Sequence, residues 1–271
     1  MELSERLERV LNEVDQASCL IDVGCDHGFL SIEAVRRGKV ERAVCSDVRK
    51  GPLERAKEHI ERAGLQEKIQ TRLADGLRGL TDGCSCLNES LQGLVSEESL
   101  QPKKEQTNYA QEDTIIVIAG MGGLLLSRIL TEAFREENNI IHSAQRVIIQ
   151  PQSEWETVRK TVDTMVFIPT SEQFFYDRGK PYWIMNLQKK ERLPQEEVAR
   201  FSYEKPWQFM YGRLLPEARD SVLLDYINHQ LGLKLQLLSS MEENSSDAAR
   251  RRKEELTEQI QRIREVKKAW D

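Results

Sequence analysis

Apolar and polar positions along the first 188 residues alternate between strand-length segments and helical stripes. The strand-length segments lie at 19–23, 42–47, 69–73, 115–119 and 146–150. The clearest helical patterns lie at 3–14, 52–63, 124–137 and 154–165. Residues 171–188 predict two further strands around a turn at 177–180. Because continuous apolar runs suit parallel strands covered on both faces, the order predicts an α/β fold: an open, doubly wound sheet ending in a hairpin.

Two parts of the chain depart from this alternation. Residues 81–113 are polar without an apolar period, which is typical of a functional lid or a disordered insertion. The tail carries two helical stripes on either side of a polar turn at 244–247, and their members are Val222, Leu223, Tyr226, Ile227, Leu231, Leu235, Leu238, then Leu256, Ile260, Ile263 and Trp270. We therefore expect an antiparallel, coiled-coil-like helical hairpin. The predicted domains are 1–188 and 189–271.

The charge balance excludes one class of protein. The chain has 39 Lys and Arg against 45 Asp and Glu, a net charge of −6, whereas a protein that coats nucleic acid is usually strongly basic. Most of this charge belongs to the insertion at 81–113, which has seven acids and two lysines. A general nucleic-acid coat is excluded, but a selective enzyme that acts on RNA is not.

Signals for export, membrane insertion and metal binding do not stand out. The amino terminus is charged and helical in pattern, unlike a signal peptide, and there is no run of about 18 apolar residues. The histidines lack metal spacing, and Cys84 and Cys86 lack the gap of a zinc motif. We expect a cytoplasmic protein with no membrane segment, no metal and cysteines that are free, mostly buried thiols.

The loop after the first strand has the composition of a cofactor site. It contains Asp22, Gly24, Asp26, His27 and Gly28. In a doubly wound sheet this loop meets the cofactor, and its glycines let the backbone approach the ligand. The G-x-G-x-x-G spacing of dinucleotide folds is missing, and two acids would repel a pyrophosphate but suit a cationic amino acid with a sulfonium. The loop favours S-adenosylmethionine over NAD. The alternative is a tight turn with capping acids.

Two further acids follow neighbouring strands. Asp47 ends the second strand, where a carboxylate can accept hydrogen bonds from both hydroxyls of a ribose. Asp75 and Gly76 end the third strand, where the carboxylate suits an adenine amino group. Acids are also common in turns at strand ends, so a plain Asp-Gly turn is the alternative at Asp75.

Glycines gather again after the fourth strand, in the turn Ala119-Gly120-Met121-Gly122-Gly123. Three glycines in four positions let a flat ligand or a base approach the backbone. Gln150 ends the fifth strand at the same edge, and its amide suits the edge of a base. A flexible strand-to-helix turn is the alternative.

Several segments, taken in order, resemble a known family. They are Leu3-Ser4-Glu5-Arg6-Leu7, Asp22-Val23-Gly24-Cys25-Asp26-His27-Gly28-Phe29-Leu30, Gly51-Pro52, Asp75-Gly76-Leu77, Ile118-Ala119-Gly120-Met121-Gly122-Gly123 and Gln150-Pro151. Together they are similar to the bacterial tRNA (adenine(22)-N1)-methyltransferases, the TrmK family. The resemblance implies a class I methyltransferase domain of Rossmann-like fold, S-adenosylmethionine as donor, and a C-terminal helical domain that helps hold tRNA.

The resemblance also implies roles for individual residues. The implied cofactor contacts are Asp22, Gly24, Asp26, His27, Gly28, Asp47 on the ribose, Asp75 near the adenine, Gly76, Ala119 and Gly120. The implied substrate contacts are Phe29, which stacks on the target base, Met121, Gly122 and Gly123, which face it, and Arg250, Arg251 and Arg252, which clamp the RNA backbone. The same basic run also suits a solvated helical face or a dimer contact.

Methylation of adenine N1 needs few polar groups. N1 carries its own lone pair, so catalysis depends mainly on holding donor and acceptor in line. Asp26 is the leading candidate to position the adenine amino group or accept its proton, and His27 and Gln150 follow it. A stacked adenine must first be exposed, so we expect partial base flipping.

The chain departs from the family pattern at three places. Gly28-Phe29 replaces an Ala-Tyr pair, Asp47 stands where Glu is frequent, and 81–113 lengthens a short linker. Three alternatives follow: a SAM-binding adaptor without catalysis, an RNA methyltransferase with another target base, and an NAD-type enzyme. We expect tRNA as the partner and a monomer or weak homo-oligomer.

Overall fold

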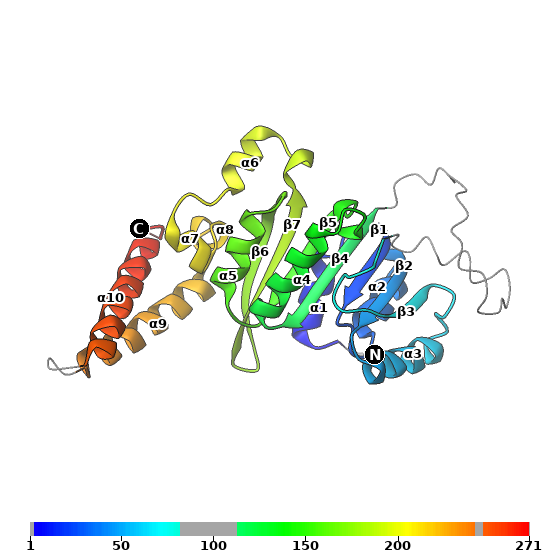
Figure 1. Cartoon of the computed structure of the whole chain (residues 1–271), viewed down its shortest axis with the longest axis horizontal. Helices are drawn as coiled ribbons and strands as arrows, with labels where there is room; N and C mark the ends of the chain where they lie inside the picture. Colours follow the sequence, from blue (N-terminus) through cyan, green and yellow to red (C-terminus); the bar gives the residue numbers. More distant parts are fainter. Residues whose placement is uncertain (1–2, 82–112, 242–245, 271) are drawn as a thin grey trace.

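The computed structural model describes residues 3–81, 113–241 and 246–270. These residues form a seven-stranded sheet of order β3-β2-β1-β4-β5-β7-β6 (Figure 1). The strands are β1 (Ala17–Val23), β2 (Val40–Asp47), β3 (Ile69–Leu73), β4 (Thr114–Met121), β5 (Arg146–Pro151), β6 (Phe167–Asp177) and β7 (Lys180–Lys189). β1 to β5 pair in parallel, whereas β7 is antiparallel to β5 and β6. The predicted doubly wound sheet with a terminal hairpin is confirmed.

Helices cover both faces of this sheet. In the first part of the chain they are α1 (Glu5–Glu13), α2 (Phe29–Arg36), α3 (Lys50–Arg62), α4 (Gly123–Arg135) and α5 (Trp155–Asp163). Leu20 packs in a buried cluster with residues of α1, α2 and α3, whereas the next residue, Ile21, packs with residues of α4 and α5. Successive side chains of a strand point to opposite faces. The strands are therefore apolar at successive positions because a layer of helices covers each face of the sheet.

Local chemistry explains several element boundaries. α1 begins after Ser4, whose hydroxyl accepts a hydrogen bond from Leu7 N (3.3 Å) and caps the helix. The β6–β7 hairpin turns at Arg178 and Gly179, with φ of 50° and 75°. A two-residue hairpin loop with two left-handed residues matches the twist of the strands it joins. The predicted turn at 177–180 is thus confirmed.

The tail forms the predicted antiparallel helical hairpin, from α9 (Ser221–Ser239) and α10 (Asp247–Lys267). Lys234 Nζ donates to Gln259 Oε1 (2.7 Å) between the helices, and Trp270 Nε1 donates to Asp220 O (3.2 Å) at the opposite end. The apolar stripe is buried only in part. Val222 and Leu235, both predicted members, are 39% exposed.

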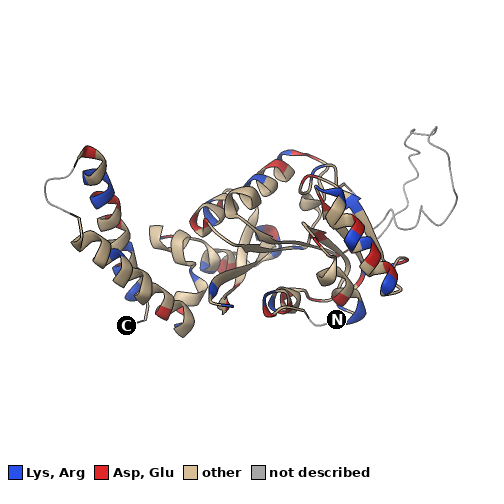
Figure 2. Cartoon of the chain, turned by 90° about the horizontal axis from the view of Figure 1, so that it is seen from below, with Lys and Arg blue, Asp and Glu red and all other residues tan. Residues whose placement is uncertain are grey.

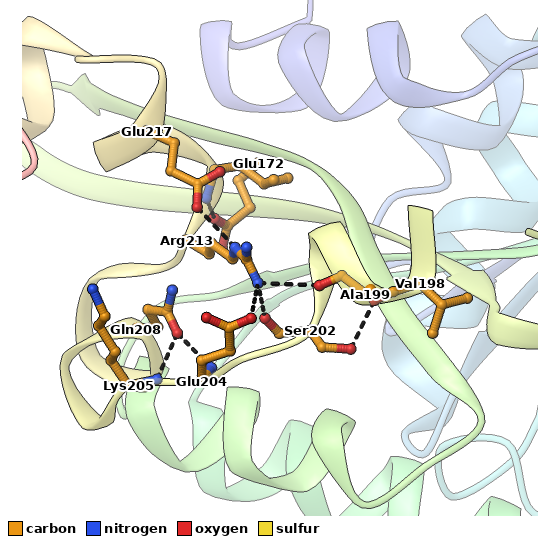
Figure 3. Close-up of polar contacts among 10 residues, drawn as sticks. Glu172, Val198, Ala199, Ser202, Glu204, Lys205, Gln208, Arg213 and Glu217 are labelled. Atoms are coloured by element: carbon orange, nitrogen blue, oxygen red, sulfur yellow. Dashed lines mark hydrogen bonds and ion pairs between the residues drawn. The ribbon is translucent and has the colours of Figure 1, made fainter. Parts of the chain in front are cut away.

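Three short helices link β7 to this hairpin and were not predicted. They are α6 (Gln195–Phe201), α7 (Pro206–Tyr211) and α8 (Leu214–Glu217). Each is too short to display a helical period. Arg213 holds them together (Figure 3): it bonds the carbonyl oxygens of Ala199 (3.3 Å) and Ser202, and it pairs with Glu204 (3.6 Å) and Glu217 (2.8 Å).

A buried ion pair joins these helices to the sheet. Arg159 of α5 and Glu172 of β6 have fully buried side chains and pair at 3.0 Å. Arg159 Nη1 also donates to the carbonyl oxygens of Phe209 and Met210 (both 3.3 Å), and Glu172 Oε2 accepts from Leu214 N (3.3 Å). The pair's remaining polar atoms are thus satisfied by backbone groups of α7 and of the first residue of α8.

The remaining expectations have mixed outcomes. β6 begins at Phe167, four residues earlier than predicted, because its first residues pair with the end of β7. Cys25 and Cys45 are free, buried thiols as expected, but Cys19 is disulfide-bonded, so that expectation is wrong there: burial alone does not fix the state of a thiol. Residues 82–112, nearly all of the predicted insertion, lie outside the described residues.

The described parts of the chain were also searched for membrane spans and metal sites. Within them, no helix combines the length and apolar character needed to cross a bilayer. No group of three or more His, Cys, Asp or Glu in the same ranges is arranged to hold a metal ion.

Candidate active site

The carboxyl ends of β1, β2, β3 and β4 surround a cavity of about 580 Å³. Predicted site residues that line it are Gly24, Asp26, Asp47, Asp75, Gly76, Ala119, Gly120 and Met121. A smaller cavity of about 80 Å³ beside it shares Gly24, Asp26 and Ala119 and adds Asp22, His27 and Phe29. Most predicted residues therefore meet at one sheet edge, where ligands bind in open α/β folds.

The loop after β1 has a conformation that requires glycine. Gly24 has a φ of +73°, and a Cβ there would lie 2.3 Å from Met121 Cε of the neighbouring strand. The amides of Gly24 and Cys25 donate to Ser46 O (2.8 and 3.0 Å), which ties the loop to β2. Asp26 also adopts a left-handed conformation, with a φ of 50°, which is uncommon for a non-glycine residue. The tight turn brings bare backbone to the cavity.

Asp26 and His27 lie at the exposed rim of this loop. The Asp26 side chain is 59% exposed, pairs with Arg55 (3.3 Å) and lies 3.5 Å from His27 Nε2. The His27 ring stacks on Phe29 with 5.2 Å between centroids. His27 Nδ1 is buried and has no hydrogen-bond partner among the described residues. A carboxylate and two stacked rings thus stand where a ligand in the cavity would meet them.

Asp22 is the buried acid of the site. It is 5% exposed, and its carboxylate accepts a hydrogen bond from Ser31 Oγ (3.0 Å). Burial raises the pKa of Asp22 to about 6, although the Ser31 bond and the charge of Arg6 oppose the rise. A cationic group that entered the cavity would favour the ionised form. Asp22 therefore suits a ligand that carries an amino group.

Asp47 and Asp75 face the larger cavity from the next two strands. Asp47 is 6% exposed and accepts a hydrogen bond from Arg49 N (2.9 Å) through Oδ1. Asp75 is more open to solvent and is bound by Arg128 at 3.1 and 3.4 Å. Both acids pair with an arginine, since Arg49 Nε lies 3.7 Å from Asp47 Oδ1, but only Asp47 is also buried and held by a backbone amide.

Gln150, a candidate catalytic residue, is buried beside the candidate site. Gln150 is fully buried and is not among the lining residues of either cavity. Its Oε1 accepts hydrogen bonds from Arg6 Nη1 (2.9 Å) and Gly120 N (3.1 Å), and its Nε2 donates to Pro151 O (3.3 Å). The Gln150 amide thus positions Arg6 and the Gly120 turn in this structure, and its contact with a base stays a prediction.

Three predicted glycines also lie outside both cavities. Gly28 caps α2, and a Cβ there would lie 3.2 Å from Ala56 Cβ. Gly123 N donates to Ser153 Oγ (3.3 Å) and Glu154 Oε2 (3.1 Å), and a Cβ on Gly122 would lie 3.4 Å from Ser153 Oγ. These glycines allow close packing between loops, and the expected cofactor contact of Gly28 and base contacts of Gly122 and Gly123 stay predictions.

Arg250, Arg251 and Arg252 lie at the start of α10, away from the sheet edge that carries the cavities (Figures 1 and 2). Arg250 pairs with Asp247, and Arg252 pairs with Glu255 (3.1 Å). Basic and acidic residues are interleaved along the helix (Figure 2). A contact of these arginines with RNA would therefore be separate from the candidate active site.

The sequence interpretation missed three cations beside the cavities. Arg6 lines both of them, and Arg49 and Arg128 line the larger one. Arg6 lies in the first family-like segment, which was the one signal available for it. Arg49 and Arg128 belong to no sequence motif. One lies on a loop and the other on a helix, and only the folded chain shows which strand ends they face.

Two family models match the chain. Residues 3–90 match a methyltransferase domain, and residues 105–265 match the tRNA (adenine(22)-N(1))-methyltransferase family. The second match spans more than half of the chain.

Individual proteins are similar over nearly the full length. A tRNA (adenine(22)-N(1))-methyltransferase of Bacillus subtilis (strain 168) is 24% identical, with 98% of this chain and 97% of the relative covered. A Streptococcus pneumoniae protein, solved in complex with S-adenosyl-L-methionine, is 27% identical with a TM-score of 0.72, covering 98% and 99% of the two chains. The crystal structure of the B. subtilis M1A22 tRNA methyltransferase, 22% identical, covers 100% and 99% with a TM-score of 0.75, which shows the shared fold.

Proposed function

The chain belongs to the tRNA (adenine(22)-N(1))-methyltransferase family, and from this premise we propose that it transfers a methyl group from S-adenosylmethionine to N1 of adenine 22 in tRNA. The observation that carries the proposal is the cavity where Asp47 and the backbones of Gly24 and Gly120 meet. The S. pneumoniae relative that holds the cofactor supports the same conclusion.

The residues of the cavity fit this cofactor. A volume of about 580 Å³ lies within the range of small-molecule sites, roughly 300–1,000 Å³. Asp47 would accept hydrogen bonds from the ribose hydroxyls, and Asp22 and Asp26 complement a cationic amino acid. Arg6 lines both cavities and forms no ion pair with the described acids, so it is suited to the cofactor's carboxylate.

The chain's own task in the reaction is positioning. When bound, S-adenosylmethionine supplies an electrophilic methyl group on its sulfonium. Adenine N1 has a free lone pair, so the protein need not remove a proton before transfer and gains rate chiefly by alignment. Asp26, exposed at the cavity rim, would accept a hydrogen bond from the adenine amino group or take up its proton afterwards. Phe29 would stack on the base.

The wider organisation follows from the same proposal. We assign the cofactor site to residues 1–188 and contacts with the tRNA body to residues 189–271. Because tRNA is the substrate, we place the reaction in the cytoplasm, and we expect the enzyme to act as a monomer or weak homo-oligomer.

The direct test is incubation with labelled S-adenosylmethionine and unmodified tRNA transcripts, followed by mass analysis of nucleosides. We expect 1-methyladenosine, lost when adenine 22 is replaced by guanine. Cofactor binding without any methylated nucleoside would contradict the proposal and identify an adaptor. Methylation that survives the replacement would show another target base.

Asp47→Ala tests the cofactor assignment separately. Because two charged hydrogen bonds to the ribose would be lost, we expect S-adenosylmethionine to bind more weakly by about 1–3 kcal/mol, measured by titration calorimetry. Asp47→Glu is the matched control, since it retains the carboxylate. An unchanged affinity in the alanine variant would refute the ribose assignment.

A further inference from the structure

A separate cavity of about 530 Å³ opens beyond the end of β5. The loop after β5, the start of β7 and Tyr226 of α9 line it. It shares no lining residue with the cavity of the proposed cofactor site, but Gln152 N at its edge donates to Met121 O of that cavity (2.8 Å). Adjacent strands are about 5 Å apart. The two cavities are therefore neighbours on one edge of the sheet.

Three of the eight residues that line this cavity are aromatic. Trp155, Tyr182 and Tyr226 all line it. The Trp155 and Tyr226 rings pack with the buried cluster on the α4 and α5 face of the sheet, 5.9 Å apart between centroids, whereas the Tyr182 ring stacks on Phe175 on the opposite face. Rings that are braced in this way are rigid surfaces for stacking. Aromatic rings are how proteins hold the unstacked bases of single-stranded nucleic acid.

Positive charge lies at the mouth of the same cavity. Lys180 lines it and is exposed, and Arg178 lies two residues earlier in the β6–β7 turn. Neither forms an ion pair with an acid of the described residues, unlike most of the exposed arginines on α1 to α4. Free cations beside aromatic rings match the phosphates and bases of a nucleotide.

The loop that forms one side of the cavity is strained. Glu154 has a φ of 46°, the left-handed region that non-glycine residues seldom adopt. Its carboxylate accepts a hydrogen bond from Gly123 N (3.1 Å), which ties the loop to the start of α4. Strain of this kind is typical of functional sites, where it holds a surface in place before a ligand binds.

We propose that this cavity binds an unpaired nucleotide of the tRNA, next to the nucleotide that is methylated. The base stacks on Tyr226 beside Trp155, and Lys180 contacts the phosphate. The inference depends on the proposed function in one respect, because it takes tRNA to be the substrate. A flipped adenine leaves its neighbours unstacked, and a second aromatic site beside the first holds one of them in place.

The test measures tRNA binding, S-adenosylmethionine binding and methylation on the same variants of the full chain. Tyr226→Ala should weaken tRNA binding about 5- to 100-fold, the range for loss of one stacked base, whereas Tyr226→Phe keeps the ring and should bind as the unmodified protein does. Lys180→Ala should lower the salt dependence of binding by about one phosphate contact. Lys57→Ala, an exposed lysine on α3, is the matched control for charge.

The outcomes separate this inference from the proposed function. If Tyr226→Ala and Lys180→Ala bind tRNA like the unmodified protein while adenine 22 is still methylated, the second site is wrong and the methyltransferase stands. If both variants weaken binding but the unmodified protein makes no 1-methyladenosine, the site stands and the proposed reaction is wrong. The site would also be overturned if Lys180→Ala lost tRNA binding and cofactor binding equally. The same holds if Lys57→Ala weakened tRNA binding as much as Lys180→Ala does.

Discussion

At the scale of single residues, Asp22 links stability to function. Its folded pKa of about 6 lies above the ordinary value of 3.8 because the side chain is buried. Between these two values the folded protein holds a proton that the unfolded chain has released. The contribution of Asp22 to the free energy of unfolding is therefore fully present below pH 3.8 and is lost as the pH rises through 6.

Asp22→Asn tests this linkage. The variant cannot ionise, so we expect it to be more stable than the unmodified protein at pH 8, by on the order of 2 kcal/mol, and to differ little near pH 4. Urea unfolding at both pH values measures the difference. The same variant should bind S-adenosylmethionine more weakly at pH 8, because the charge that complements an amino group is lost. A stability difference that does not change with pH would argue against a raised pKa.

At the scale of elements, the segment between α7 and α8 is fixed against the buried Arg159–Glu172 pair. Gly212 lies in that segment with a φ of +74°, and a Cβ there would lie 2.3 Å from Glu172 Oε2. Glycine is required both by the backbone conformation and by the close approach of the carboxylate. The chain can turn at Gly212 because glycine has no Cβ that would collide with the Glu172 carboxylate.

Gly212→Ala should therefore destabilise the protein by about 2–4 kcal/mol, through left-handed strain and displacement of Glu172. Gly232→Ala is a matched control in the middle of α9, where a Cβ meets nothing within 4 Å. That control should stabilise the protein by about 0.5–1 kcal/mol, because alanine favours a helix. Urea unfolding of both variants gives the comparison, and similar changes at both sites would contradict the assignment.

At the scale of the whole molecule, the helical hairpin is continuous with the main core. Leu223 and Ile227 of α9 and Ile263 and Val266 of α10 belong to the same buried cluster as residues of α5 and β7. Tyr226 of α9 also lines the second cavity. Deleting the hairpin would expose that cluster and disturb the second cavity, so its contribution to RNA binding is better tested on its surface.

Charge reversal at the start of α10 provides that test. Arg250→Glu with Arg251→Glu should weaken tRNA binding about tenfold or more at low salt, because contacts with phosphates would be lost, and should leave S-adenosylmethionine affinity unchanged. Lys57→Glu with Lys68→Glu makes the same change in net charge near α3, at the opposite end of the molecule (Figure 1). An equal effect of both pairs on filter-binding affinity would mean that net charge, and not α10, is responsible.

Much of the fold could be predicted from the sequence. Burial on both faces of a strand and on one face of a helix leaves a local period, so 115–119 and 146–150 predicted β4 and β5 to within two residues. The loop at 22–28 was recognisable because its glycines and acids are adjacent in the chain. Helices α6 to α8 were not predictable, because each is too short to show a helical period. Contacts of Arg213 with residues far from it in the chain stabilise them.

The sequence by itself determined the sheet, its two helical layers, and the acids and glycines that follow the strands, because these depend on neighbours within a few residues. Only the tertiary structure decided which of those groups face a ligand. Arg6 bonds Gln150 from 144 residues away, and that contact, which no local pattern indicates, holds a candidate catalytic amide inside the protein. The second cavity likewise joins the loop after β5, a hairpin and α9, whose proximity is fixed by packing and by no local pattern.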